Sequence, residues 1–356
     1  MRHHACDWPR RPCRTLSSPA WGADVSTPLL ELMGISKRFA KSPDLAARIA
    51  LKLGAGTPPV VVHALDRVNL RVMQGEVVGL VGESGCGKST LGRVAVGLHA
   101  PSSGDRRWKG NVIAPDDLPT RLAIQMIFQD PYASLNPRLR IADIIGEAPV
   151  AHKLIAPADQ EAYVADLMQQ VGLDATLMRR FPHQFSGGQR ARIGIARALA
   201  VKPEFLVCDE AVAALDVSIQ AQVLNLFIAL REKLGLTYLF ISHDLGVVQH
   251  ISDRVVIMYL GRVVESAPTE EVFRAPLHPY TQALLAEVPR LDQRRKDFVA
   301  IKGEIPSPIH PPSGCHFHPR CPHATERCRA EAPPLIEAGP GRVVACHLHS
   351  AAQNAS

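Results

Sequence analysis

The residues of this chain best suited to chemistry lie in the segment Gly82-Glu-Ser-Gly-Cys-Gly-Lys-Ser-Thr90. It has the pattern G-x-x-x-x-G-K-[ST], in which consecutive backbone N–H groups wrap the phosphates of a nucleotide. The glycines let the main chain approach phosphate oxygens without a Cβ clash. Lys88 supplies a point charge for the β- and γ-phosphates, and the Ser89 hydroxyl can bind Mg²⁺. The residues of this predicted nucleotide site are Gly82, Glu83, Ser84, Gly85, Cys86, Gly87, Lys88, Ser89 and Thr90.

The elements around this loop follow from the apolar pattern. Residues 77–81 form a continuous apolar run, which is typical of a strand buried on both faces of a parallel sheet. Residues 91–98 are predicted to begin a helix, whose N-terminal dipole would strengthen an anion site. A strand, a glycine-rich loop and a helix in this order favour a phosphate-binding loop over an ordinary glycine-rich turn.

Two carboxylates, Asp209 and Glu210, follow a second apolar strand predicted at residues 205–208. The carboxyl ends of parallel strands form the edge where ligands bind in open α/β sheets. There Asp209 can hold Mg²⁺, and Glu210 can polarise a water that attacks the γ-phosphate. Alone, the pair could equally be solvated side chains at a strand end. Together with the phosphate loop, they indicate one active site.

The rest of the pattern alternates strands with helices, which predicts an α/β fold with a mostly parallel sheet covered on both faces. Further strands are expected at residues 29–40, 60–72, 123–128 and 236–241. Helices are expected around residues 164–171, at 187–201 after an N-cap at Ser186, and at 217–234. Residues 255–264 predict a closing antiparallel hairpin around Gly261.

Composition narrows the class of protein. The 356 residues carry 40 basic and 34 acidic side chains, a net charge of 40 − 34 = +6, and the isoelectric point is near 9.0. This excess suits polyphosphates, nucleic acid or an anionic membrane surface without choosing among them. No apolar run is long enough to span a bilayer. Residues 1–27 lack the apolar core of a secretory signal, and we expect them to be a disordered leader or sequence upstream of the true start. A thiol beside a nucleotide, at Cys86, favours a reducing compartment and hence the cytoplasm.

The segment Phe185-Ser-Gly-Gly-Gln-Arg190 resembles the signature segment of ABC-transporter ATPases, and it has that family's place between Gln129 and the Asp209 strand. Ala214-Leu-Asp216 looks like the family's D-loop, and His243 like its switch histidine. Phe39 takes the place of the aromatic residue that stacks on adenine. The resemblance spans about residues 29–265.

The resemblance implies that two such subunits pack head to tail, with ATP between the phosphate loop of one and the signature turn of the other. That turn consists of Ser186, Gly187, Gly188 and Gln189. Asp216 would connect the two sites across the interface. The implied catalytic residues are Lys88, Gln129, Glu210 and His243, and the implied Mg²⁺ ligands are Ser89, Gln129 and Asp209. Two departures from the family pattern are Ala211 and Ala213, and residues 41–58 form an insertion after Phe39.

Three further segments resemble the oligopeptide/dipeptide importer branch, in particular its second ATPase subunit. They are residues 128–137 (FQDPYASLNP), 278–285 (HPYTQALL) and 301–308 (IKGEIPSP). The resemblance implies a peripheral subunit on the cytoplasmic face of the inner or plasma membrane. Its implied partners are a second ATPase subunit, two transmembrane permeases and an extracytoplasmic solute-binding protein, without nucleic acid.

Several alternatives stay open. Nickel and glutathione importers share the same segments, so the cargo is not fixed, and neither is the choice between a homodimer and a heterodimer. A soluble ABC ATPase acting on nucleic acid or ribosomes suits the basic charge, but the importer-like tail and the single nucleotide-binding unit disfavour it. A phosphotransferase would have no use for the signature segment.

We expect an ABC ATPase domain at residues 28–265, with a helical subdomain at about 130–200, and an extension at 266–356 where proline and histidine become frequent. The extension holds Cys315, Cys321, Cys328 and Cys346, with spacing C-x5-C-x6-C-x17-C. This differs from the paired C-x2-C of common zinc modules. Four thiolates predict a [4Fe–4S] cluster, with zinc or unmetallated thiols as alternatives. A similar cysteine-rich tail is frequent in the importer branch.

Overall fold

The computed structural model describes residues 27–40, 60–114, 116–130, 133–287 and 303–350. The predicted leader, apart from Thr27, and the insertion at 41–58 lie outside the described residues.

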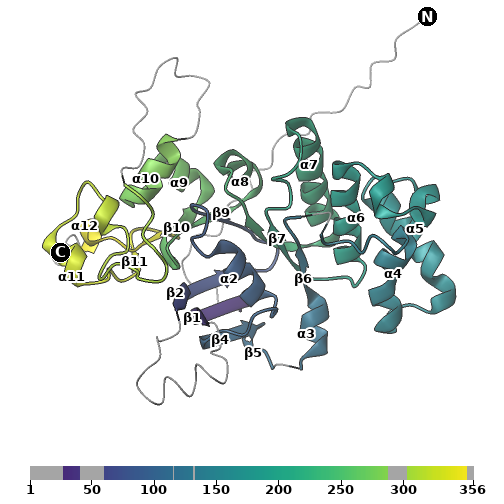
Figure 1. Cartoon of the computed structure of the whole chain (residues 1–356), viewed down its shortest axis with the longest axis horizontal. Helices are drawn as coiled ribbons and strands as arrows, with labels where there is room; N and C mark the ends of the chain where they lie inside the picture. Colours follow the sequence, from purple (N-terminus) through teal and green to yellow (C-terminus); the bar gives the residue numbers. More distant parts are fainter. Residues whose placement is uncertain (1–26, 41–59, 115, 131–132, 288–302, 351–356) are drawn as a thin grey trace, which may run out of the picture.

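A sheet of eight strands forms the centre of the molecule, in the order β11-β12-β10-β9-β3-β8-β7-β6 (Figure 1). Its five parallel strands are β3 (Val77–Val81), β6 (Ile124–Ile127), β7 (Phe205–Asp209), β8 (Thr237–Ile241) and β9 (Arg254–Tyr259). β10 (Arg262–Pro268) runs antiparallel to β9. The predicted parallel sheet and closing hairpin are therefore present. Every residue of β3, β7 and β8 is buried, as the continuous apolar runs predicted.

A second, antiparallel sheet has the order β2-β1-β4-β5. Its strands are β1 (Leu30–Ala40), β2 (Val61–Val72), β4 (Ser103–Trp108) and β5 (Asn111–Val112). The first two match the predicted strands. The other two were not predicted, because β4 carries the polar sequence SGDRRW and β5 has two residues.

The helices connect the parallel strands. They are α2 (Lys88–Ala95), α3 (Leu118–Ala123), α4 (Ile141–Ala151), α5 (Gln160–Gln170), α6 (Gly187–Leu199), α7 (Val217–Leu234) and α8 (Leu245–Ile251). Short 3₁₀ helices occupy Pro157–Asp159, Ala175–Arg179, Pro182–Gln184 and His318–Arg320. In α5 the predicted apolar stripe of Val164, Leu167 and Met168 is buried. α6 begins at the predicted N-cap Ser186.

The sheet separates two apolar clusters, because alternate residues of a strand face opposite sides. Leu206 and Phe240 pack with α5, α6 and α7 on one face. Val207 and Ile241 pack with α2 and the antiparallel sheet on the other. Both layers position the ends of β3, β7 and β8 at one edge.

The C-terminal segment adds two short strands to this sheet. β12 (Val343–Val344) pairs with both β10 and β11 (Ile336–Glu337). Its helices are α9 (Thr269–Arg274), α10 (Pro279–Ala286), α11 (Glu326–Ala330) and α12 (His347–Ser350). A third cluster packs Tyr259 of β9 against Tyr280 and Phe317 of this segment. In Figure 1 the segment (yellow) lies at the opposite end of the long axis from α4, α5 and α6.

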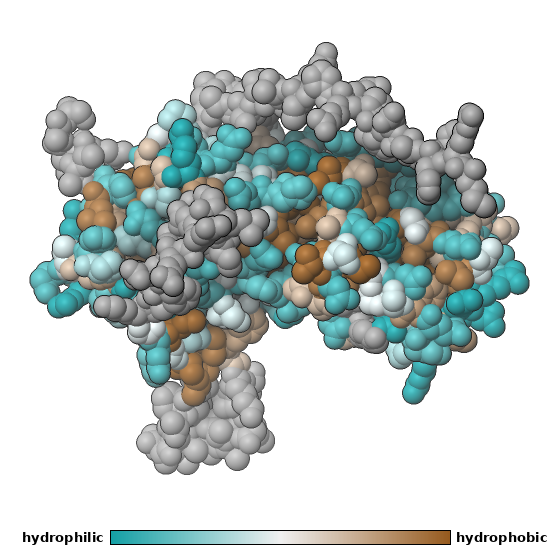
Figure 2. Space-filling model, turned by 90° about the horizontal axis from the view of Figure 1, so that it is seen from above, coloured by the Kyte–Doolittle hydropathy of each residue, from teal (hydrophilic) through white to brown (hydrophobic). Residues whose placement is uncertain are grey.

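The surface mixes polar and apolar areas. Figure 2 shows hydrophilic residues over most of one face, interrupted by apolar patches. Large exposed apolar side chains in the described ranges include Val217, Val112 and Leu98. Among these residues, none of the helices combines the length and apolarity that crossing a bilayer requires.

Candidate nucleotide site

The phosphate loop connects β3 to α2, as predicted, and tertiary contacts enclose it. A Cβ on Gly82 would lie 2.2 Å from the Met258 carbonyl oxygen, and one on Gly87 would lie 2.5 Å from that of Ala64. Gly87 also has φ +106°, a conformation that L side chains rarely adopt. The two glycines are therefore required by neighbouring backbone as well as by any bound phosphate.

Lys88 is the first residue of α2 and is 5% exposed. Its Nζ donates hydrogen bonds to the carbonyls of Gly82 (2.7 Å) and Glu83 (3.0 Å), which folds the side chain over the loop. The neighbouring Cys86 is buried, and burial raises the pKa of its thiol. Its thiol therefore stays protonated at neutral pH and fills space beneath the loop.

Ser89 and Asp209, two of the predicted Mg²⁺ ligands, lie together. The Ser89 hydroxyl donates to Asp209 Oδ1 at 2.8 Å. Asp209 is 1% exposed, and burial raises the pKa of its carboxyl while the Ser89 hydrogen bond acts in the opposite direction. A buried carboxylate with one neutral donor is a site that a cation would stabilise.

Two other predicted catalytic residues, Gln129 and His243, lie next to Glu210. Its carboxylate accepts a hydrogen bond from Gln129 Nε2 at 2.8 Å and lies 3.5 Å from His243 Nδ1. Its own N–H donates to the Ile241 carbonyl at 3.0 Å, which ties the end of β7 to the end of β8. Glu210 adopts φ +48°, an uncommon conformation for a non-glycine residue. This backbone turn directs the acid out of the strand.

One open pocket of about 600 Å³ is lined by Lys88, Ser89, Gln129, Glu210 and His243. Its walls are formed by Phe39, Val62, Ala64, Ser84, Gly85, Gly87, Lys88, Ser89, Thr90, Gln129, Glu210, His243 and Pro308. Phe39, the predicted adenine-stacking residue, is 37% exposed at the edge of this pocket. Its ring meets the His99 ring edge-on at 5.4 Å.

Pro308 was missed as a site residue. Its carbonyl accepts a hydrogen bond from the His63 N–H at 2.9 Å, and Pro308 lines the same pocket as Phe39. The sequence marked this segment only by its resemblance to importers, because nothing in its local pattern points to a nucleotide.

The signature turn lies away from the pocket. None of Ser186, Gly187, Gly188 and Gln189 is among the residues that line it. Ser186 Oγ accepts from the Gln189 N–H while Gln189 Oε1 accepts from the Ser186 N–H, so the turn forms a capping box at the start of α6. Asp216 is exposed at the N-cap of α7. One copy of the chain therefore brings together all predicted catalytic residues but not the signature turn or Asp216.

The four tail cysteines line one narrow cavity of about 10 Å³. No disulfide links them, and burial raises the pKa of Cys346 to about 11. Over the described ranges, no three His, Cys, Asp or Glu side chains are grouped as ligands of a metal ion. The four thiols line one cavity but are not arranged as ligands of a metal ion, so this arrangement does not show the predicted iron–sulfur or zinc site.

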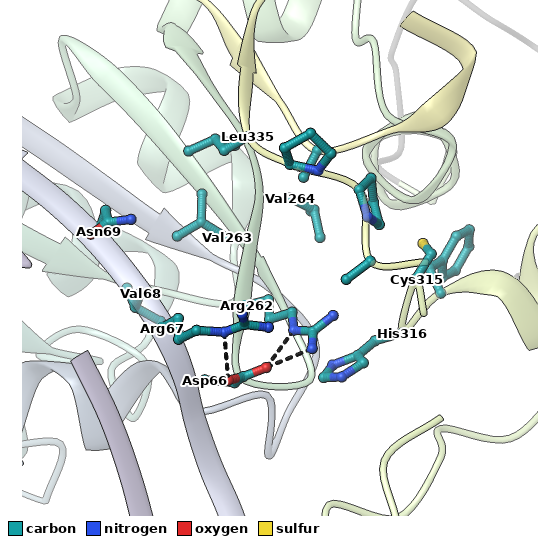
Figure 3. A pocket seen from close by; sticks show the side chains of 15 residues that line it. Asp66, Arg67, Val68, Asn69, Arg262, Val263, Val264, Cys315, His316 and Leu335 are labelled. Atoms are coloured by element: carbon teal, nitrogen blue, oxygen red, sulfur yellow. Dashed lines mark hydrogen bonds and ion pairs between the residues drawn. The ribbon is translucent and has the colours of Figure 1, made fainter. Parts of the chain in front are cut away.

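A separate cavity of about 340 Å³ lies between β2, β10 and the C-terminal segment (Figure 3). Asp66 accepts from Arg262 Nε at 2.7 Å at its floor, and His316 lies beside this pair. The predicted nucleotide-binding and catalytic residues do not line this cavity. The residues around it connect the tail to the hairpin β9–β10.

The strand–loop–helix site on a parallel sheet, with two carboxylates at the end of β7, one strand beyond the neighbour of β3, defines a P-loop ATPase. The ABC transporter family model matches residues 65–213, and the model of the oligopeptide/dipeptide transporter C-terminal region matches residues 264–328. With this evidence, the chain belongs to the family of ATP-binding subunits of oligopeptide/dipeptide-type ABC importers.

Two relatives illustrate this family. The chain is 46% identical to the dipeptide transport ATP-binding protein DppF of Haemophilus influenzae, over 90% of this chain and 97% of that protein. It is 48% identical to the oligopeptide transport ATP-binding protein AppF of Bacillus subtilis, over 90% of this chain and 98% of that protein.

Solved structures agree with this assignment. The ABC transporter component cbiO1 of Clostridium perfringens superposes with TM-score 0.57 at 27% identity, covering 70% of this chain and 92% of that one. The ATP-binding cassette MJ0796, a dimer bound to ADP and Pi, has TM-score 0.57 at 25% identity, covering 67% of this chain and 98% of that one. The predicted α/β fold of an ABC ATPase and the ATPase assignment are confirmed, whereas the predicted Cys-rich extension stays a prediction.

Proposed function

We propose that this chain drives the uptake of peptides by hydrolysing ATP on the cytoplasmic face of a membrane. Its proposed partners are a second ATPase subunit, two permeases and a solute-binding protein. The relatives' names, dipeptide and oligopeptide transport ATP-binding proteins, support this cargo. The proposed division is an ATPase domain at residues 28–265 with a helical subdomain at about 130–200, followed by an importer-type extension at 266–356.

The observation that carries the catalytic part of the proposal is the position of Glu210. Its carboxylate faces the phosphate loop across the pocket, held by Gln129 and close to His243. In our proposal Glu210 accepts a proton from the attacking water, Gln129 orients that water, and His243 donates a hydrogen bond to the γ-phosphate.

The phosphates would lie against the N-terminus of α2, where backbone N–H groups and Lys88 attract negative charge. Ser89, Asp209 and Gln129 would hold Mg²⁺, which neutralises charge on the phosphates. The Ser89–Asp209 hydrogen bond and the burial of Asp209 support this ligand set. Phe39 would stack on the adenine ring at the open edge of the pocket.

The signature turn would complete the site of a neighbouring subunit. The position of Ser186, Gly187, Gly188 and Gln189 outside the pocket supports this head-to-tail arrangement, and the MJ0796 cassette provides a dimeric precedent. Asp216, exposed beside the turn at the N-cap of α7, would contact the opposite subunit. The composition of the oligomer that assembles with the permeases shows whether that subunit is a second copy or a sister ATPase.

The test is Glu210→Gln in the assembled transporter. Removal of the general base should slow ATP hydrolysis by at least about a hundredfold while ATP is still retained. Hydrolysis is measured as phosphate release, and retention by binding of radiolabelled ATP. Near-normal turnover would remove Glu210 from its role. Loss of retained ATP along with activity would instead indicate a structural defect.

Cargo is tested separately, by uptake into vesicles of labelled dipeptides and oligopeptides against nickel ions and glutathione. Peptide uptake that depends on Lys88 supports the proposal, and uptake of nickel or glutathione alone contradicts it. RNA-stimulated hydrolysis without permeases would favour the nucleic-acid alternative.

For the tail, we propose that Cys315, Cys321, Cys328 and Cys346 bind one [4Fe–4S] cluster. What supports the proposal is that all four cysteines line one cavity. A cluster assembled during synthesis would supply a cross-link for a segment with little apolar core. Iron and sulfide in a 1:1 ratio, with broad visible absorbance lost on reduction, support this proposal. Stoichiometric zinc, or protein without metal after anaerobic purification, contradicts it.

A further inference from the structure

The C-terminal segment touches the phosphate loop directly, through a partly buried ion pair. Arg320 Nη1 donates to Glu83 Oε2 at 2.7 Å, and Nη2 donates to Glu83 Oε1 at 2.9 Å. The Arg320 side chain is 5% exposed, and its hydrogen bonds to Glu83 raise its pKa. A bidentate, partly buried arginine–carboxylate pair fixes orientation more strongly than a surface pair does.

A second contact from the same segment holds the backbone of the same residue. The Glu83 N–H donates to Tyr280 Oη at 2.8 Å, and Tyr280 is fully buried. That N–H is therefore engaged with the tyrosine instead of facing the pocket. Tyr280 belongs to the HPYTQALL segment, and Arg320 lies between Cys315 and Cys321.

Two more contacts hold the hairpin turn beside the loop. His316 Nδ1 and the Leu260 carbonyl oxygen are 2.9 Å apart, and Arg262 Nη1 donates to the Gly314 carbonyl at 2.9 Å. The hairpin turn also holds the phosphate loop, since the Gly261 N–H donates to the Cys86 carbonyl at 2.9 Å. Figure 3 shows His316 beside the side chains of Arg262 and Asp66.

We propose that Arg320 and Tyr280 are positioning residues for ATP, which set the phosphate loop through Glu83. This proposal rests on the proposed ATP hydrolysis at this loop. Arg320 also neutralises the negative charge of Glu83, which lies on a loop that must bind a polyanion. Without Arg320, the unpaired Glu83 carboxylate would repel the triphosphate and be free to displace the loop.

The charge argument predicts an unusual pattern among variants of the assembled transporter. Arg320→Gln should raise KM for ATP at least about tenfold, the scale of one lost charge-assisted hydrogen bond, while kcat changes by less than about threefold. Adding Glu83→Gln to Arg320→Gln should bring KM back to within about threefold of the wild type, because the repelling charge is gone. Tyr280→Phe alone should raise KM by about threefold, since the Glu83 N–H loses its acceptor.

Arg329→Gln is the matched control. Arg329 lies in the same tail but pairs with Glu326 at the exposed surface, so its loss should leave KM unchanged. A purely structural role for Arg320 would instead lower the amount of folded protein in the single and the double variant alike. Thermal unfolding of each variant distinguishes the two.

Three results would overturn the proposal: an unchanged KM in Arg320→Gln, a double variant worse than either single one, or a fall in kcat without a change in KM. If Arg320→Gln does not accumulate, Tyr280→Phe and the double variant decide in the same way. A wild type that does not hydrolyse ATP would remove the proposed function itself. An active wild type with an unaffected Arg320→Gln would remove this inference alone.

Discussion

The phosphate loop and the signature turn are both glycine-containing N-termini of helices, but they are held in opposite ways. The phosphate loop has no side-chain cap at Gly87 and is supported by distant residues, including Met258, Ala64 and Arg320. The signature turn is held by its own capping box of Ser186 and Gln189 and lies at the surface. One anion site is set by tertiary structure; the other has its own capping box, with Gly188 packed closely against Ile219.

This difference has a consequence for function. A loop enclosed by backbone carbonyls has one shape, which suits an anion site that belongs to this chain alone. A turn that satisfies its own N-cap leaves the N–H groups of Gly187 and Gly188 without intrahelical acceptors, as at any helix start. Such a turn can be offered to a ligand held by another subunit without rearrangement of its own fold. Substitutions in the two regions should therefore fail in different ways.

The largest effect is expected for Gly87→Ala. The new Cβ would lie 2.5 Å from the Ala64 carbonyl oxygen. The alanine would also have to adopt φ +106°, so the loop has to move. Strain of about 3 kcal/mol corresponds to at least about a hundredfold weaker ATP binding. Titration with a fluorescent ATP analogue measures it.

Gly85→Ala provides the matched control for that experiment. Gly85 has φ +77° but no atom within 4 Å of a built Cβ, so its substitution carries the conformational cost without the clash. Its ATP affinity should fall by about tenfold, which is clearly less. Equal losses in the two variants would show that the enclosing carbonyls do not set the loop.

An intermediate effect is expected for Gly187→Ala. Its Cβ would lie 3.8 Å from Leu215, an ordinary contact, so the free energy of unfolding should change by less than about 0.5 kcal/mol. ATP hydrolysis by the assembled transporter should nevertheless fall about tenfold, because a methyl group would separate this turn from the neighbouring subunit's phosphates. Reduced stability of the isolated chain, or unchanged hydrolysis, would contradict an exposed, shared turn.

The same contrast explains which features the sequence could predict. The N-cap at Ser186, the helix after it and the strand–loop–helix around Lys88 depend on residues close together in the chain, so local patterns predicted them. The companions of the phosphate loop depend on the topology of the sheet. Arg320 is 237 positions from Glu83, and Tyr280 is 197 positions away. A single sequence has no local signal that joins such residues.

The errors elsewhere have the same physical origin. β4 was missed because its residues are mostly exposed and polar, and the pairing with β1 supplies the strand conformation instead. The pairing of the extension with the main sheet was not predicted, because regular periodicity fades after about residue 275. β12 is only two residues long, too short for any period, yet its pairing with β10 adds the tail to the main sheet.

The smallest effect is expected for Ser186→Ala, which tests the self-contained nature of the signature turn. The substitution removes the acceptor for the Gln189 N–H and should lower the free energy of unfolding by about 1 kcal/mol, the usual loss for an N-cap. Urea denaturation of the purified chain measures it. Ser186→Asp keeps the capping acceptor and should retain stability, but its negative charge should repel the neighbouring subunit's phosphates and reduce hydrolysis. Stability and hydrolysis that fall together in Ser186→Asp would mean that the turn depends on its surroundings, as the phosphate loop does.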